Sequence, residues 1–152
     1  MVKFSKSVIL NVEKDLLTKS QLNFRGVNYE LNPLFHMTAP NEWKDRLLTE
    51  APVNEKLFSS VILLFGFLPI DLHHLHFKQI LKNGFKESSN SLLMKEWNHN
   101  RIIETSEQGS TLTDEILFST RIPFLGAIIK PIYLLAFRHR HERLKKKFGC
   151  GC

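Results

Sequence analysis

Most of the chain consists of short apolar or alternating runs bounded by turn residues, which is the pattern of β-strands. The C-terminal end instead shows the spacing of an amphipathic α-helix. The strand pattern predicts strands over residues 4–11, 34–38, 57–65, 72–81, 85–91, 92–105 and 111–122. Short helices are predicted over residues 15–20, 24–31 and 41–48, and one long helix over residues 124–148.

Tight turns between neighbouring strands indicate an antiparallel meander. Asn83-Gly84 is the strongest hairpin signal in the chain, and residues 107–110 form the next turn. Parallel strands would need long crossover connections instead. The run 57–65 is continuously apolar, which is typical of a strand covered on both faces. The order of one strand, short helices, antiparallel strands and a long helix predicts an α+β fold.

The predicted C-terminal helix is almost wholly apolar in its first half and needs a large apolar surface to lie on. Six residues at helical spacing are expected to face the sheet: Leu125, Ile128, Ile129, Ile132, Leu135 and Ala136. Pro131 is expected to kink this helix because it removes a backbone donor. A curved antiparallel sheet around one long helix leaves a cavity, so the chain is interpreted as a container for a small apolar molecule.

Several motifs resemble those of a bacterial branch of the START and plant-allergen superfamily, also called SRPBCC or polyketide cyclase-like. They are residues 32–40 (NPLFHMTAP), 63–71 (LLFGFLPID), 97–101 (WNHNR), 113–114 (TD) and 137–144 (FRHRHERL). The resemblance covers nearly the whole chain and implies the helix-grip fold. It also implies a hydrophobic pocket between helix and sheet, used elsewhere in the superfamily for lipids, sterols, quinones or polyketides. It implies no catalytic residues, because that superfamily has no invariant catalytic set.

Polar residues occupy what should be the inward face of two neighbouring strands. Residues two apart in a strand share a face, so His99 and Arg101 point the same way as Trp97. Pairing through the 107–110 turn brings them toward Asp114, where Arg101 and Asp114 would form a charge pair tuned by His99. Glu87 could join this cluster. The cluster is either structural, the polar end of a ligand pocket, or a general acid–base site centred on His99.

The function predicted from these patterns is non-covalent binding of a small hydrophobic ligand that is lipid-, quinone-, sterol- or polyketide-like. The apolar pocket wall is predicted to consist of Leu63, Phe65, Phe77, Trp97, Phe118, Ile128 and Ile132. His99, Arg101 and Asp114 are predicted at its polar end, and no residue is assigned a catalytic role. The alternatives are a cyclase- or aromatase-type enzyme, a membrane-associated lipid or quinone carrier, and a purely structural or partner-binding domain.

Composition supports a single globular domain. The chain has 152 residues, of which 43% are hydrophobic and 24% charged. We expect one ligand-binding domain over residues 1–149, followed by a short Cys-containing tail over residues 150–152. The 12 Phe residues, against two Tyr and two Trp, offer apolar area without a polar group, which suits a pocket wall.

The net charge of +6 is concentrated near the C-terminus. The cations there are Arg138, Arg140, Arg143, Lys145, Lys146 and Lys147. Cations in the last turns of a helix interact favourably with its dipole, so a solvated helix end is the simpler interpretation. A weak contact of this basic end with an anionic membrane is the alternative. No nucleic-acid partner is expected.

Clustered histidines and two cysteines raise the question of a metal site. His74 and His76 would share a strand face, but no second ligand pair is evident, and His139 and His141 should lie on different sides of the helix. Neither a metal nor a cofactor is therefore predicted. The cysteines of the tail, at positions 150 and 152, are interpreted as exposed free thiols.

A cytoplasmic location is expected from two features. The N-terminal apolar run is too short for a secretory signal. The longest apolar stretch near the C-terminus is interrupted by Lys130 and Pro131 and is shorter than the roughly 20 residues of a bilayer span.

Overall fold

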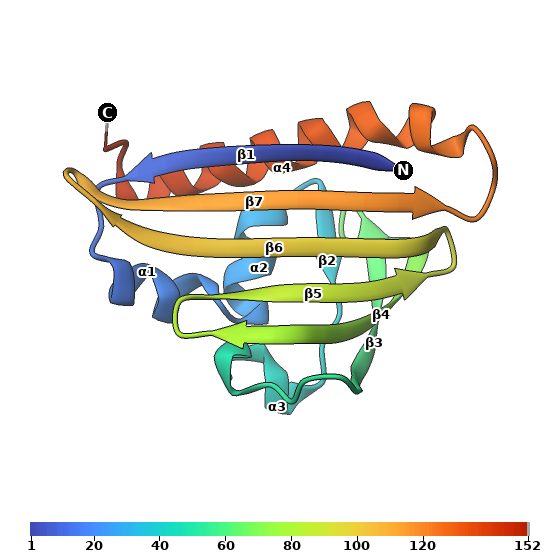
Figure 1. Cartoon of the computed structure of the whole chain (residues 1–152), viewed down its shortest axis with the longest axis horizontal. Coiled ribbons are helices and arrows are strands. Elements are labelled where there is room, and N and C mark those ends of the chain that lie inside the picture. The colour runs from blue at the N-terminus through green and yellow to red at the C-terminus, as the bar shows by residue number, and fades with distance from the viewer. Residues whose placement is uncertain (152) are drawn as a thin grey trace.

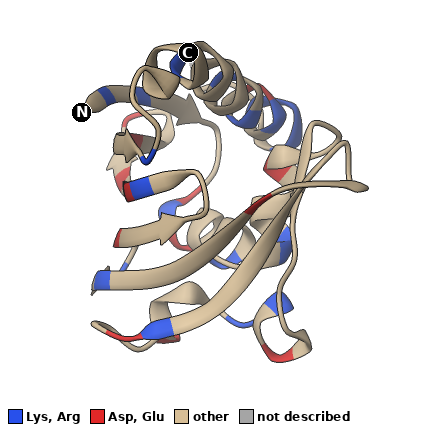
Figure 2. Ribbon diagram, turned by 90° about the vertical axis from the view of Figure 1, so that its right-hand side faces the viewer, with Lys and Arg blue, Asp and Glu red and all other residues tan. Residues whose placement is uncertain are grey.

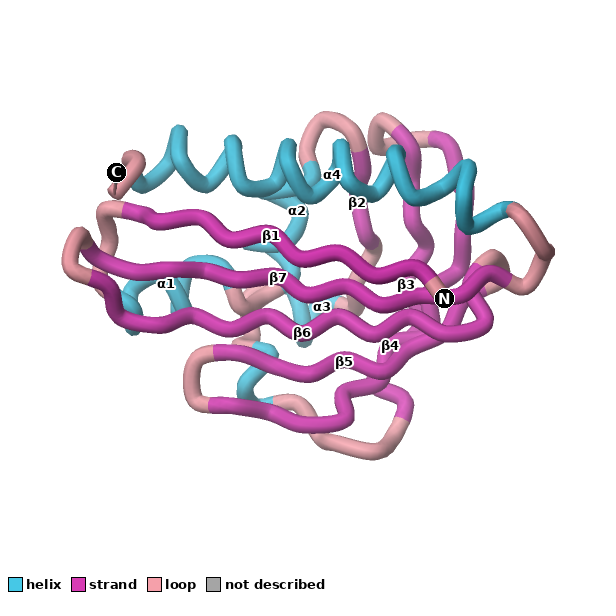
Figure 3. Tube along the Cα trace, turned by 45° about the horizontal axis from the view of Figure 1, so that its top comes forward, coloured by secondary structure: helices cyan, strands magenta, loops and turns pink. Residues whose placement is uncertain are grey.

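The computed structural model describes residues 1–151 and contains a seven-stranded sheet in the order β1-β7-β6-β5-β4-β3-β2 (Figure 1). The strands are β1 (Val2–Leu10), β2 (Phe35–Met37), β3 (Lys56–Leu64), β4 (Leu68–Leu81), β5 (Gly84–Ser91), β6 (Met94–Ser106) and β7 (Gly109–Thr120). Every neighbouring pair is antiparallel, as the tight turns predicted. The sheet is strongly curved, so that β2 and β3 rise behind the long helix in Figure 3.

The helices lie inside the curve of the sheet. They are α1 (Lys14–Gln21), α2 (Phe24–Leu31), α3 (Asn41–Lys44), the 3₁₀ turn η1 (Leu48–Glu50) and α4 (Leu125–Phe148). The long helix α4 runs along β1 and packs against β1, β7 and α2 (Figure 3). The α+β helix-grip arrangement predicted from the sequence is confirmed. Within residues 1–151, no helix has both the length and the hydropathy needed to cross a bilayer.

The helix predicted over residues 41–48 is broken into two pieces. The first piece, α3, ends at Lys44, and a 3₁₀ turn begins at Leu48. The backbone N–H of Leu48 donates to the carbonyl of Leu22 at 2.7 Å, outside any helical pattern. This tertiary hydrogen bond replaces the helical one that the sequence pattern favoured.

The prediction that the strand over residues 57–65 is covered on both faces is wrong. In β3 only Ser60 is fully buried, and the apolar residues around it stay partly exposed. The reason is position, because β3 lies near the end of the curved sheet, where its only neighbour on the outer edge is the three-residue strand β2. The continuous apolar run in β3 therefore reflects partly exposed apolar surface and not burial of both faces of the strand.

The prediction for the inner face of α4 is also wrong in part. Ile128, Ile132 and Leu135 are 64%, 50% and 60% exposed. The fully buried residues of α4 are Ile129, Ala136, Phe137, Arg140, His141 and Leu144. They also follow helical spacing, so the helix is rotated by about one residue from the predicted orientation.

The core consists of two hydrophobic clusters. One lies under α1 and α2 and includes Leu10, Phe24 and Phe77. The other lies under the first half of α4 and includes Trp97 and Phe118.

The C-terminal residues extend the sheet rather than trailing into solvent. The carbonyl of Gly149 accepts from the backbone N–H of Asn11 at 3.1 Å, and the N–H of Gly151 donates to Ile9 at 2.9 Å. The free thiol predicted for Cys150 is wrong, because this residue is disulfide-bonded. The prediction for Cys152 lies outside the described residues.

Candidate ligand-binding cavity

A cavity of about 220 Å³ lies between α4, α2 and the concave face of the sheet. Its walls are mostly apolar. The helices contribute Phe24, Val27, Leu31, Ile129, Ile132, Tyr133, Ala136 and Phe137. The sheet contributes Phe35, Met37, Ile62, Ile70, Leu75, Phe77, Phe85, Met94 and Trp97.

Four of the ten residues predicted to bind the ligand line this cavity. They are Phe77, Trp97, His99 and Ile132. Arg101 and Asp114 are fully buried beside it but do not reach its surface. Phe118 is also fully buried and packs on Trp97 from behind. Ligand contact by any of these residues stays a prediction.

The other three predicted wall residues lie away from the cavity. Leu63 follows an irregularity in the pairing of β3 with β4, and its neighbour Ile62 faces the cavity instead. Such a shift moves side chains to the opposite face of a strand. Phe65 is 60% exposed at the end of the β3–β4 hairpin, and Ile128 is on the outer face of α4.

The predicted charge pair between Arg101 and Asp114 is present. The two residues are direct cross-strand partners between β6 and β7. Arg101 Nε donates to Asp114 Oδ1 at 2.7 Å and Arg101 Nη2 donates to Asp114 Oδ2 at 2.8 Å, which makes a bidentate pair. His99 Nε2 donates to Asp114 Oδ1 at 2.7 Å.

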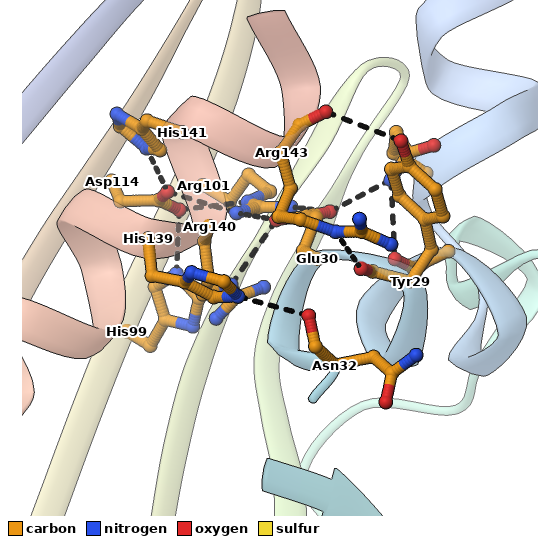
Figure 4. A network of polar contacts seen from close by, with 12 residues as sticks. Tyr29, Glu30, Asn32, His99, Arg101, Asp114, His139, Arg140, His141 and Arg143 are labelled. Carbon is orange, nitrogen blue, oxygen red and sulfur yellow. Dashed lines mark hydrogen bonds and ion pairs between the residues drawn. The ribbon is translucent and has the colours of Figure 1, made fainter. Parts of the chain in front are cut away.

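Three further members of this network were missed by sequence reasoning (Figure 4). Glu30 of α2 accepts from Arg101 Nη1 at 2.8 Å and Nη2 at 2.7 Å. Arg140 of α4 donates to the same carboxylate at 3.1 Å. His141 Nε2 donates to Asp114 Oδ2 at 2.8 Å. The network therefore joins α2 and α4 to the sheet.

The carboxylates of this network remain charged in spite of their burial. Burial alone would raise the pKa of Asp114, but the charge of Arg101 and hydrogen bonds from His141 and His99 hold it well below its usual value. Burial alone would also raise the pKa of Glu30, but the positive charges of Arg101 and Arg140 outweigh burial and lower this pKa. The pKa of Arg101 is raised, since its two carboxylate partners outweigh the cost of burial.

A second set of polar groups faces the cavity directly. His73 Nε2 donates to Glu87 Oε1 at 2.6 Å, and Ser89 Oγ donates to the same oxygen at 2.7 Å. His99 Nδ1 lies 3.7 Å from Glu87 Oε2, so His99 connects Glu87 with Asp114. Glu87 thus joins the cluster, as the sequence suggested. Burial alone would raise the pKa of Glu87, but the hydrogen bond and charge of His73 outweigh burial and lower this pKa to about 2.

Arg140, rather than Arg101, brings a guanidinium group to the cavity. Arg101 donates four hydrogen bonds to Asp114 and Glu30 and does not line the cavity. Arg140 lines it, and its terminal nitrogens have no hydrogen-bond partner in the described chain. Sequence reasoning had placed Arg140 among the solvated cations of the helix end.

The histidines of β4 do not gather around a common point. His73 is bound to Glu87, while His74 Nδ1 is 2.8 Å from Ser59 Oγ on the other side of the strand. No group of three or more metal-ligating side chains is arranged to hold an ion in residues 1–151.

One sequence family accounts for most of the chain. Residues 8–148 match the family model described as "Domain of unknown function (DUF8410)". The chain belongs to the DUF8410 family. No curated protein sequence matches it.

Solved structures share the fold of this DUF8410 protein. Protein CV1439 from Chromobacterium violaceum has a TM-score of 0.72 at 11% identity, with 97% of each chain covered. A START superfamily protein from Mycobacterium smegmatis has a TM-score of 0.66 at 10% identity, with 96% of each chain covered. Ara h 8.0201 has a TM-score of 0.55 at 9% identity, with 95% of this chain and 98% of that chain covered. At these identities the likeness shows the fold, and it confirms the START-like fold predicted from the sequence.

The DUF8410 cavity also has polar groups near its opening that the sequence did not single out. Ile70 and Ile132 line the cavity yet are 39% and 50% exposed, so they mark where it reaches solvent. Asp71 follows Ile70 on β4, and Tyr133 follows Ile132 on α4. Both side chains line the cavity.

Proposed function

We propose that the protein binds a compact hydrophobic small molecule without forming a covalent bond to it. The cavity between α4 and the concave sheet carries this proposal. Its walls are mainly aromatic and aliphatic, with a few polar groups, as is usual for small-molecule sites. The START-like fold supports this class of function, because the superfamily that the sequence resembles uses such a cavity for hydrophobic ligands.

The size of the cavity narrows the class of ligand. At about 220 Å³ it is smaller than the roughly 300–1,000 Å³ typical of sites for drug-sized ligands. A short aromatic, quinone-like or cyclised polyketide-like compound therefore fits the cavity better than a full-length lipid. Arg140 and the His73–Glu87 pair offer polar partners to such a compound.

Filling the cavity should abolish binding. Ala136 is 4% exposed and lines the cavity, so Ala136→Leu places extra side-chain volume in the ligand's space. Native mass spectrometry of freshly purified wild-type protein should show a bound compound, and A136L should lack it. Ala127→Leu is the matched control, because Ala127 is exposed on the same helix. Equal occupancy in wild type and A136L would contradict the proposal.

An enzyme of the cyclase or aromatase type is an alternative function for the same cavity. Its support is the line of ionisable groups His73, Glu87 and His99 in the cavity wall, since a general acid or base must be within hydrogen-bond reach of its substrate. The compound extracted from the protein decides between the two. The extracted compound is added back to the protein, incubated and analysed again. An enzyme converts it to a compound of different structure, whereas a binding protein returns it unchanged.

A membrane-associated carrier is a further alternative, favoured by an exposed apolar rim that includes two residues of the cavity opening, Ile70 and Ile132. The rim residues are Phe65, Phe67, Leu68 and Ile70 of the β3–β4 hairpin and Ile122, Phe124, Ile128, Ile132 and Leu135 at α4. Phe65 and Phe124 have φ angles of 54° and 68°, a conformation that costs a bulky residue about 1–2 kcal/mol. The backbone thus holds two large aromatic side chains outward at an energetic cost.

The occupant proposed for this rim is a bilayer that contains anionic lipids. Between Glu115 and Glu142 the chain has no acidic residue and four cations, Arg121, Lys130, Arg138 and the buried Arg140. Figure 2 shows the basic residues along α4. The basic C-terminal end is less available for this role. Lys145 pairs with Glu142, and Lys147 donates to Ser20 and Gln21.

Polar substitution of the rim should weaken membrane binding. Phe67→Ser combined with Phe124→Ser should reduce co-sedimentation with phosphatidylglycerol-containing vesicles at least tenfold, since each buried Phe contributes about 1.5–3 kcal/mol. Leu16→Ser is the control, because Leu16 is 60% exposed on α1 at the other end of the molecule (Figure 1). If Lys145→Glu, Lys146→Glu and Lys147→Glu together cause the loss of vesicle binding and the Phe substitutions do not, the membrane contact belongs to the basic end.

A further inference from the structure

We propose that Asp71 anchors the ligand by accepting a hydrogen bond from a protonated amine or a hydroxyl group at the cavity opening. This inference rests on the proposed binding function and specifies the chemistry of the ligand. It concerns a residue outside the Glu30–Arg101–Asp114 network.

Asp71 is a buried carboxylate with one unoccupied oxygen. Its side chain lines the cavity and the residue is 7% exposed. Asp71 Oδ1 accepts from the backbone N–H of Leu72 at 2.8 Å and of Leu93 at 3.3 Å. Asp71 Oδ2 is buried and has no hydrogen-bond partner in the described chain. The two backbone donors fix the carboxylate, so that its second oxygen is already positioned for a ligand.

The contrast with the other buried carboxylates is clear. Glu30, Glu87 and Asp114 each form at least two contacts with arginine or histidine side chains. Asp71 forms none within residues 1–151. A buried polar atom without a hydrogen-bond partner, such as Asp71 Oδ2, is costly, and proteins keep such atoms mainly where a ligand, ion or water completes them.

Tyr133 is the second polar group at this position. Burial and the negative charge of Asp71 both raise the pKa of the Tyr133 hydroxyl, so the hydroxyl stays protonated. It makes no hydrogen bond to the part of the chain that the structure describes. The Tyr133 ring packs on Trp97 with centroids 4.9 Å apart, which orients the phenol at the cavity wall. A ligand hydroxyl could therefore donate to Asp71 and accept from Tyr133.

The position of Asp71 sets the orientation of the ligand. Ile70 and Ile132 at the opening precede Asp71 and Tyr133, while Phe77 and Phe85 line the cavity from inside the core. The donor group of the ligand should therefore stay near the opening and its apolar body should extend toward the two Phe rings. A carboxylate or phosphate in the donor's place would face the charge of Asp71 and be disfavoured.

Four probes with one apolar body test this inference by isothermal titration calorimetry. They are naphthalene, 2-naphthalenemethanol, 2-naphthylmethylammonium and 2-naphthoate. The ammonium probe should bind wild type at least about tenfold more tightly than naphthalene, and naphthoate should bind more weakly than the ammonium probe. Asp71→Asn should remove the preference of the protein for the ammonium probe over naphthalene. Glu96→Gln, the same substitution chemistry at an exposed position of β6, should change neither this preference nor the affinity for naphthalene.

The outcomes separate the two proposals. Equal binding of naphthalene and both donor probes would overturn the role of Asp71 and leave the proposed function standing, with water as the partner of Oδ2. Failure of every probe to bind would overturn both. A second measurement uses wild type alone, so it does not depend on whether the Asp71→Asn variant folds. The ammonium probe, but not naphthalene, should shift the backbone amide resonances of Leu72 and Leu93. Absence of that shift on binding would also contradict the inference.

Discussion

Replacing Arg101 with Met should lower the free energy of unfolding by about 3–5 kcal/mol, because it leaves two buried carboxylates without their main partner. Arg101 is 1% exposed and donates to Glu30 and Asp114, both of which are completely buried. Denaturant unfolding at neutral pH measures the change. Arg25→Met is the control, since Arg25 pairs with Asp45 on the surface and its loss should leave the midpoint unchanged.

A second substitution shows whether uncompensated charge is the cause. Adding Asp114→Asn to Arg101→Met removes one of the two unpaired carboxylates, and part of the lost stability should return. The hydrogen bonds from His99 and His141 can still be accepted by the Asn oxygen. If adding Asp114→Asn instead lowers the free energy of unfolding below that of R101M, the network contributes through packing rather than through charge.

The part of the fold set by local pattern could be predicted from the sequence. Strand positions follow from runs of a few residues and from turns such as Asn83-Gly84, and the structure forms that hairpin. The pairing of Arg101 with Asp114 was also predictable, because two strands joined by a tight turn have a restricted register. In both cases the information lies within about twenty residues of chain.

The partners from distant elements could not be found in this way. Glu30 lies 71 residues from Arg101 and 110 residues from Arg140 in the sequence, and it belongs to a short helix whose position depends on tertiary packing.

The orientation of α4 depends on the same contacts. Its apolar residues are spread widely enough to allow more than one inner face. Burial of Arg140 and His141 against their carboxylate partners selects the face that contains Phe137.

The local irregularity in β3 explains the misplaced wall residues. Leu63 and Phe65 were both predicted in the pocket wall, but the pairing of β3 with β4 shifts between Ile62 and Leu63. Phe65 then adopts a positive φ of 54°, which directs it outward. Bulges of one residue leave little trace in a run where every residue is apolar, so the sequence alone could not reveal this shift.

Acid should destabilise the protein, and Glu87→Gln should remove a defined part of that effect. The pKa of Glu87 is lowered to about 2 in the folded chain, where burial opposes the hydrogen bonds and charges of His73 and His99. Because the folded value lies below the unfolded value of 4.5, this stabilisation is complete above the unfolded pKa and is lost as pH falls through about 2.

The two proteins should therefore differ most at neutral pH and converge in acid. A lowering from 4.5 to about 2 corresponds to roughly 3 kcal/mol, so E87Q should be less stable than wild type by about that amount above pH 5. The difference should disappear near pH 2, while Glu30 and Asp114 continue to cause a common loss in both proteins. Urea unfolding at a series of pH values measures both curves, with Glu96→Gln expected to follow wild type throughout. Parallel curves for wild type and E87Q would mean that Glu87 has the same pKa in the folded and unfolded chains, and that its hydrogen bond to His73 does not depend on its charge.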